Sequence, residues 1–210
     1  MKAADDFSQP PQGYNLITPE GWFQIPLNPE ERDRSISALA ERQFNGLDNA
    51  PLLKSEFMRD LQKKARDSYA LGGTELYLST LTIGPVPLAS SLLISVPAPD
   101  EWPSISDVDE MSEHLADRAS QNSSHKAEGG YELTVVELAV AGRAVRQRRR
   151  EAADPTAQMG NTLPTTTLTY YVPIPASALW LLMNFSTPVD PLADQIVELF
   201  DVVAGTLHWT

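Results

Sequence analysis

The sequence predicts an α+β protein built on one antiparallel sheet of six to seven strands with helices on both faces. Three observations indicate this class. Hydrophobic periodicity changes repeatedly between 3.6 and 2 residues along the 210-residue chain. The predicted strands follow one another in pairs joined by short turns, which makes neighbouring strands antiparallel. Several strands carry apolar residues on both sides, so helices should cover both faces of the sheet.

The first third of the chain combines a polar arm with two helices. Residues 1–13 are polar and rich in proline, so we expect a disordered arm before a single domain at 14–210. Asn28 is a typical helix cap, and Glu31 can reach back to it. The apolar stripe of the helix that follows is Ile36, Leu39, Ala40 and Phe44. A second helix after Pro51 has the stripe Leu53, Phe57, Leu61 and Ala65.

The remainder alternates between paired strands and helices. We expect strands at 76–83 and 88–96, a helix at 104–120 and a hairpin at 131–153. A two-residue turn at Ala141-Gly142 would place Glu137 opposite Arg146. In the same register Val135 would face Arg148. Two more strands at 165–174 and 179–185 precede a final helix capped by Asp190-Pro191. The predicted buried stripe of that helix is Leu192, Ile196, Leu199, Val203 and Leu207.

Composition excludes several classes of function. The chain has 16 Lys and Arg against 28 Asp and Glu, a net charge of -12. This balance argues against nucleic acid as a partner, because phosphate requires a surplus of cations. With no cysteine, no metal-spaced histidine pair and no phosphate-binding or nucleophile motif, we expect no metal, no cofactor and no catalytic residue. The N-terminus is unlike a secretory signal, and the apolar runs are shorter than the roughly 20 residues of a membrane span, so we expect a cytoplasmic protein.

A run of arginines is the first candidate for a binding site. Five of them lie within 143–150 of one predicted strand, and alternation places Arg146, Arg148 and Arg150 on one face. One interpretation is a solvated edge strand, or one neutralised by acids elsewhere in the chain. The other is a strip that binds an acidic segment of a partner protein, since guanidinium groups bind carboxylates well. Trp180, in a later strand, is the second candidate for partner contact.

The order of elements resembles the PsbP-like fold family. The resemblance is carried by Pro19-Glu20-Gly21-Trp22 before an apolar strand, by the strands at 169–173 and 179–185, and by the terminal amphipathic helix. That family includes the PsbP photosystem subunit, a Ran-binding nuclear import factor, bacterial DcrB and the mycobacterial LpqN lipoproteins. The resemblance implies an antiparallel sheet of about six or seven strands between helices, used as a protein-binding platform without chemistry.

These observations predict a non-enzymatic accessory protein of bacterial origin, such as an adaptor or chaperone. One alternative is a carrier of a small molecule or lipid, which needs a closed apolar cavity of roughly a few hundred Å³. A second alternative is a hydrolase, for which His114 or His125 would have to meet acids in a cleft.

Overall fold

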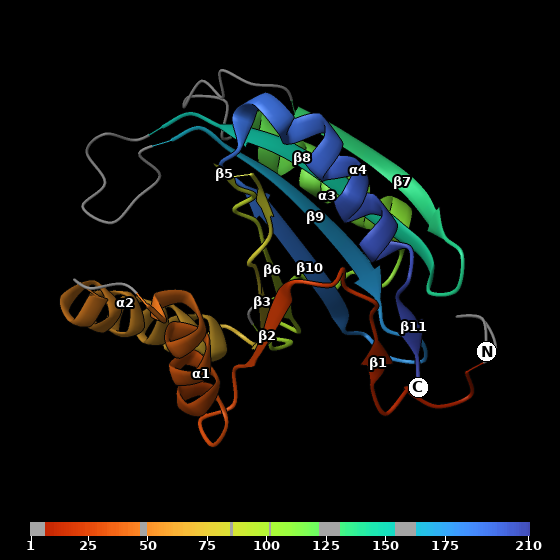
Figure 1. Cartoon of the computed structure of the whole chain (residues 1–210). Coiled ribbons are helices and arrows are strands. Elements are labelled where there is room, and N and C mark those ends of the chain that lie inside the picture. Colours follow the sequence, from red (N-terminus) through yellow and green to blue (C-terminus); the bar gives the residue numbers. More distant parts are fainter. Residues whose placement is uncertain (1–6, 47–49, 85, 101, 122–130, 154–162) are drawn as a thin grey trace.

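A computed structural model describes residues 7–46, 50–84, 86–100, 102–121, 131–153 and 163–210. Its centre is a seven-stranded sheet in which every neighbouring pair is antiparallel, with the order β2-β3-β6-β10-β9-β8-β7 (Figure 1). The strands are β2 Trp22–Pro26, β3 Gly73–Ser79, β6 Ser91–Ser95, β7 Tyr131–Leu138, β8 Gly142–Glu151, β9 Thr165–Pro173 and β10 Trp180–Thr187. The predicted α+β class and the number of strands are confirmed.

Helices cover both faces of this sheet. On one face, α4 (Ala193–Ala204), entered through the short 3-10 turn Asp190–Leu192, packs on β9 and β10. The register places a second set of side chains on the opposite face, among them Ile25, Leu93 and Val145. There α1 (Arg32–Phe44) and α2 (Ala50–Ala70) pack at the β2–β3 edge, and α3 (Val108–Gln121) packs at the β7–β8 edge. The structure therefore has a sheet between two helical layers.

Asn28 and Glu31 make the predicted contact, but they do so in the turn before α1, which begins three residues later than predicted, at Arg32. Asn28 Oδ1 accepts from the Glu31 backbone N–H at 3.0 Å, and Asn28 Nδ2 donates to the Glu31 carboxylate at 2.8 Å. These reciprocal bonds satisfy groups that the first helical turn leaves unpaired. In α2 the predicted stripe holds only at the carboxyl end, where Leu61 and Ala65 are buried, whereas the side chain of Leu53 is 56 % exposed. The amino-terminal half of α2 extends beyond the edge of the sheet (Figure 1).

The predicted stripe of α4 is confirmed in part: Ile196, Val203 and Leu207 are buried, whereas Leu192 and Leu199 are not. The structure buries Ala193, Ile196, Val197, Phe200, Val203 and Ala204. Leu192 and Leu199 are only half-buried. The reason is Phe200, whose ring stacks on Phe185 with centroids 4.9 Å apart and meets Trp22 edge-on at 6.2 Å. Aromatic rings contribute much of the burial energy of a core, so the helix presents Phe200 to the sheet.

The β7–β8 hairpin has a longer turn than predicted. Leu138 pairs with Gly142, so residues 139–141 form a three-residue loop, and Gly142 has a positive φ of 88°. Three-residue hairpin loops usually end in this left-handed conformation, which glycine adopts without strain. Glu137 therefore faces Arg143, and the predicted pairing of Glu137 with Arg146 is wrong. Val135 faces Val145 instead of Arg148.

The two ends of the described chain lie side by side. Strand β1 (Tyr14–Asn15) pairs with β11 (His208–Trp209), and the backbone N–H groups of Gln12 and Gly13 donate to the Thr210 carbonyl. Of the predicted disordered arm, residues 1–6 lie outside the described residues, whereas Phe7 packs against the core. A separate small hairpin joins β4 (Thr82–Ile83) to β5 (Val86–Pro87). Among the described helices, none combines the length and the apolar character needed to cross a membrane.

Candidate functional site

Three of the five arginines of β8 lie on the face that α4 covers. Alternation along the strand places Arg146, Arg148 and Arg150 on the face that α4 covers, as predicted. Arg146 donates from Nε to Asp201 Oδ1 at 2.8 Å and from Nη2 to Oδ2 at 3.0 Å. Arg148 pairs with Asp194, and Arg150 donates to both oxygens of Asp190 at 2.9 and 2.8 Å. The three pairs form a ladder in which β8 and α4 run antiparallel.

This ladder corrects the expectation of an open arginine strip. The guanidinium groups of Arg146, Arg148 and Arg150 already bind carboxylates of the same chain, which is the neutralised arrangement named as the other interpretation of the sequence. The hydrogen bond that Arg146 donates to Asp201 and the negative charge of that carboxylate raise the pKa of Arg146 against the opposing effect of burial. Tyr170 also donates to Asp201, and burial together with that carboxylate raises the pKa of its phenol. The ladder fastens α4 to the sheet.

Trp180 also lies inside the protein. Its side chain is 1 % exposed and packs with Ile105 and Met111 beneath α3. The indole N–H donates to the Ile105 carbonyl at 2.6 Å. A buried tryptophan usually has such a partner for its polar edge. The expectation that Trp180 contacts a partner protein is therefore wrong, because its surface is occupied by the core.

On the face opposite α4, the described helices pack mainly at the two edges of the sheet. The α1–α2 pair contacts β2 and β3, and α3 contacts β7 and β8. Between these edges lie β6, β10 and β9, the middle strands of the sheet. Asn184, on β10, is exposed, and its register partners Leu93 and Thr169 are half-buried. Because Asn184 is exposed, this part of the face is open between the α1–α2 pair and α3, and we call it the trough. Farther along β10 and β9, Trp180 and Tyr171 are buried beneath α3.

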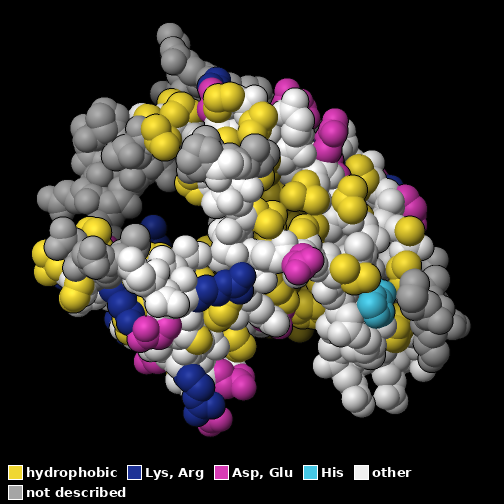
Figure 2. Space-filling view, viewed as in Figure 1, with side chains coloured by type: hydrophobic (Ala, Val, Ile, Leu, Met, Phe, Trp, Pro, Cys, Tyr) yellow, Lys and Arg dark blue, Asp and Glu magenta, His cyan; other side chains and the backbone are white. Residues whose placement is uncertain are grey.

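The floor of the trough carries no charged side chain at its centre. Thr169 Oγ1 donates to Asn184 Oδ1 at 3.4 Å, and the hydroxyls of Ser91 and Ser186 are 2.9 Å apart. Leu93 and Leu182 supply apolar surface beside them. In the space-filling view a hollow is visible beside the α1–α2 pair (Figure 2). We call the surface formed by Ser91, Leu93, Thr169, Leu182, Asn184 and Ser186 the open face.

A chain of hydrogen bonds stiffens the α3 side of the open face. Tyr171 donates to Gln147 Oε1 at 3.1 Å, and Gln147 Nε2 donates to the Tyr131 hydroxyl at 3.2 Å. Tyr131 in turn donates to the Leu115 carbonyl at 3.3 Å, while Arg149 lies over the Tyr131 ring at 5.6 Å. Burial raises the pKa of Tyr171, so this phenol remains a donor. A satisfied buried network of this kind fixes the position of the elements it joins.

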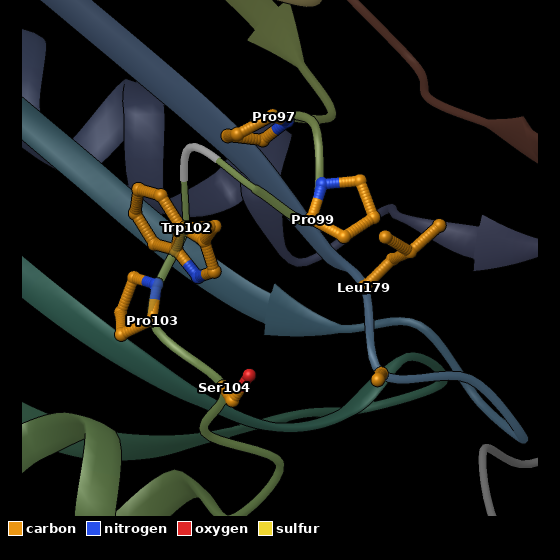
Figure 3. A pocket seen from close by; sticks show the side chains of 7 residues that line it. Pro97, Pro99, Trp102, Pro103, Ser104 and Leu179 are labelled. Atoms are coloured by element: carbon orange, nitrogen blue, oxygen red, sulfur yellow. The ribbon is translucent and has the colours of Figure 1, made fainter.

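A small pocket lies at the end of the sheet, beside Trp102 (Figure 3). Its lining residues are Pro97, Pro99, Trp102, Pro103, Ser104, Ala178 and Leu179, and the cavity holds about 50 Å³. The Trp102 ring stacks on Tyr171 with centroids 6.1 Å apart. Drug-sized ligands occupy roughly 300–1,000 Å³, so this pocket does not supply the closed cavity that a carrier would need.

The histidines do not form a catalytic cluster in the described part of the chain. His208 Nδ1 lies 3.3 Å from the Thr206 carbonyl, and His125 lies outside the described residues. Within the described ranges, no three His, Cys, Asp or Glu residues are placed to hold a metal ion.

The open face was missed by sequence reasoning, although one signal was present: Asn184 is a lone amide within the apolar run at 179–185.

Comparison with known proteins finds likeness only among solved structures. No protein family and no curated protein matches the chain. LpqN, described as involved in cell envelope biogenesis of Mycobacterium tuberculosis, is 12 % identical with a TM-score of 0.47, over 97 % of this chain and 87 % of LpqN. PsbP from Synechocystis is 12 % identical with a TM-score of 0.41, over 94 % of this chain and 87 % of PsbP. The yeast Ran-binding protein Mog1p, from Saccharomyces cerevisiae, is 11 % identical with a TM-score of 0.38, over 64 % of this chain and 78 % of Mog1p.

These three proteins are of the kinds that the sequence resembles. At these values of identity and TM-score the likeness concerns the fold and carries no argument about function. The chain is thus similar in fold to PsbP-like proteins.

Proposed function

We propose that this chain is a non-enzymatic accessory protein that binds a segment of a partner protein on its open face. The observation that carries the proposal is the exposure of Asn184 at the centre of a seven-stranded sheet. Helices that covered the whole face would bury more apolar surface and stabilise the fold further. Here the two helical units stand apart, and the uncovered strands between them offer a surface for another molecule.

The chemistry of the open face favours a segment with little charge. Hydroxyl and amide groups of Thr169, Asn184 and Ser186 can exchange hydrogen bonds with the backbone of a bound chain. Leu93 and Leu182 offer half-buried apolar contacts next to them. An exposed part of a sheet suits a polypeptide segment better than a small molecule, which is usually bound in a cavity that buries most of its surface.

A site-specific cross-linking experiment tests this proposal. A photoreactive benzoylphenylalanine replaces Asn184 in one variant and Val202 in another; Val202 is 67 % exposed on α4, on the other side of the sheet. After irradiation in the native organism, position 184 should give a discrete cross-linked protein that position 202 does not give. Equal labelling from both positions, or none from 184 under conditions where the variant is folded, would contradict the proposal.

Three expectations from the sequence remain predictions. Fractionation of the native organism should place the protein in the cytoplasm, and the organism should be bacterial. Purified protein should show no hydrolytic activity, because the sequence carries no nucleophile motif and no metal-spaced histidine pair.

A further inference from the structure

The two edges of the sheet differ in how they are protected from pairing with another strand. Edge strand β2 has five residues, ends at Pro26 and lies beside α1. Edge strand β7 has eight residues, YELTVVEL, without proline, lysine or arginine. In Figure 1, β7 runs along the outer margin of the sheet, with no ribbon on its outer side. Proteins usually blunt an exposed edge with short strands, proline or charge. Of these, β7 has only charge, in the form of two glutamates, so its edge is a candidate pairing surface.

The outer side of β7 presents free backbone groups. All eight residues pair with β8 on the inner side. In the described part of the chain, no backbone hydrogen bond reaches β7 from the outer side. In an antiparallel ladder every second residue points its N–H and C=O away from the partner strand. Tyr131 and Val135 are also exposed, 38 % and 37 %, so the edge offers side-chain contacts as well.

Charge indicates which kind of strand fits this edge. Glu132 and Glu137 are the charged residues of β7, and they point to opposite faces of the sheet. The nearest guanidinium to Glu132 is that of Arg146, at 3.8 Å, and that group is already bound to Asp201. A second copy of the chain would add two more glutamates to the seam and a further net charge of -12. A strand with lysine or arginine on both faces would instead place opposite charges across the pair, which stabilises a sheet.

We infer that β7 is a strand-addition site for an extended basic segment of a partner protein. Main-chain hydrogen bonds to the outer side of β7 would provide affinity, and Glu132 and Glu137 would select for basic side chains. This inference goes beyond the proposed function. It uses neither Asn184 nor any other residue of the open face, so either surface can fail its test while the other holds.

Binding of a defined peptide tests the inference. The probe is an end-capped synthetic peptide of about nine residues, long enough for a typical strand, in which valine is interrupted by lysine on both faces. A second peptide has glutamate in place of lysine. At low salt the lysine peptide should slow amide hydrogen exchange at alternate residues of β7, and the glutamate peptide should not. Slowed exchange elsewhere on the acidic surface but not on β7 would overturn the inference.

Matched charge variants separate edge binding from general attraction to an acidic protein. The double variant Glu132→Lys, Glu137→Lys should weaken binding of the lysine peptide by about tenfold or more and should admit the glutamate peptide. The control Glu113→Lys, Glu198→Lys makes the same change of net charge at exposed positions on α3 and α4. The control should weaken binding only slightly. Equal losses in the two double variants would overturn the inference.

Proline variants test the backbone contribution. Thr134→Pro and Val135→Pro are adjacent, so one of them removes an outward N–H and the other removes an N–H bonded to β8. The variant that keeps the native melting temperature is the outward one, and it should abolish protection by the lysine peptide. Retained protection would overturn the inference. A concentration-dependent dimer that buries β7 in the absence of peptide would also overturn it, because the occupant would then be a second copy.

Discussion

The Arg146 guanidinium on β8 binds the Asp201 carboxylate on α4 through two hydrogen bonds, of 2.8 and 3.0 Å. It is the innermost rung of the ladder, since the Arg146 side chain is 15 % exposed. Two-pronged pairs of this kind are stronger and more specific in geometry than a single contact. The ladder fixes α4 over one face of the sheet. The exposed part of the central strands therefore lies on the other face.

Removal of Arg146 should therefore destabilise the fold. The variant Arg146→Ala leaves Asp201 without its cation in a partly buried position, and the free energy of unfolding should fall by about 1.5–3 kcal/mol. Arg143→Ala on the same strand is the matched control, because Arg143 pairs with Asp109 at the surface. Exposed ion pairs contribute little. Urea unfolding of the two variants checks this, and similar losses would contradict a special role for the inner rung.

Two adjacent residues of α4, Leu199 and Phe200, should differ in how much they contribute to stability. Phe200 is fully buried against Phe185 and Trp22, whereas Leu199 is half-buried. Phe200→Ala should lower the free energy of unfolding by about 3–5 kcal/mol, the usual loss for a buried aromatic residue. Leu199→Ala should cost clearly less. Thermal and urea unfolding measure both changes, and a larger loss at Leu199 would mean that the helix is rotated toward the stripe predicted from sequence.

A third prediction concerns high pH. Tyr14 and Tyr77 both donate to Glu75 Oε2, at 3.0 and 2.9 Å, and burial together with that carboxylate raises the pKa of both phenols above the ordinary value near 10. Above about pH 10 the unfolded chain loses these protons while the folded chain keeps them, so stability should fall as pH rises.

The measurement is urea unfolding at about pH 8 and pH 11. The double variant Tyr14→Phe, Tyr77→Phe cannot titrate at these positions, and its stability should fall less over the same interval. Other groups, such as Tyr170, titrate in both the native chain and the double variant. Comparing how steeply the free energy of unfolding falls with pH in the two proteins therefore removes their effect. Equal slopes would show that these phenols titrate alike in the folded and unfolded chains.

Much of the fold could be predicted because local patterns agree with it. The Asn28–Glu31 cap, the alternation of the β8 arginines and the order of elements all follow from short-range rules. The hairpin register was wrong because nothing local distinguishes a two-residue turn at Ala141-Gly142 from the three-residue loop before Gly142. The predicted stripe of α4 was right at Ile196 and Val203 but wrong at Leu199, because tertiary packing places the neighbouring Phe200 against the sheet.

The candidate site was harder to predict because it depends on contacts between distant segments. Asp190 and Asp194 are four residues apart near the start of the last helix, a rise of about 6 Å along a helix axis. Arg150 and Arg148 are two residues apart, a rise of about 6.6 Å along a strand. These matched spacings could have indicated the ladder. Apart from Asn184, no residue of the open face gives such a signal, because the exposure of this surface depends on where the α1–α2 pair and α3 end.

Whether the open face binds a partner protein is decided by the affinity of the chain for the partner that cross-linking identifies, measured with both proteins purified. Asn184→Trp fills the centre of the trough, and Val202→Trp adds the same bulk on the far side, at an exposed position of α4. Isothermal titration calorimetry on variants with native melting temperatures should show affinity reduced at least about tenfold, a change of about 1.4 kcal/mol, for Asn184→Trp only. Unchanged affinity in Asn184→Trp, or an equal loss in Val202→Trp, would contradict binding of the partner at the open face.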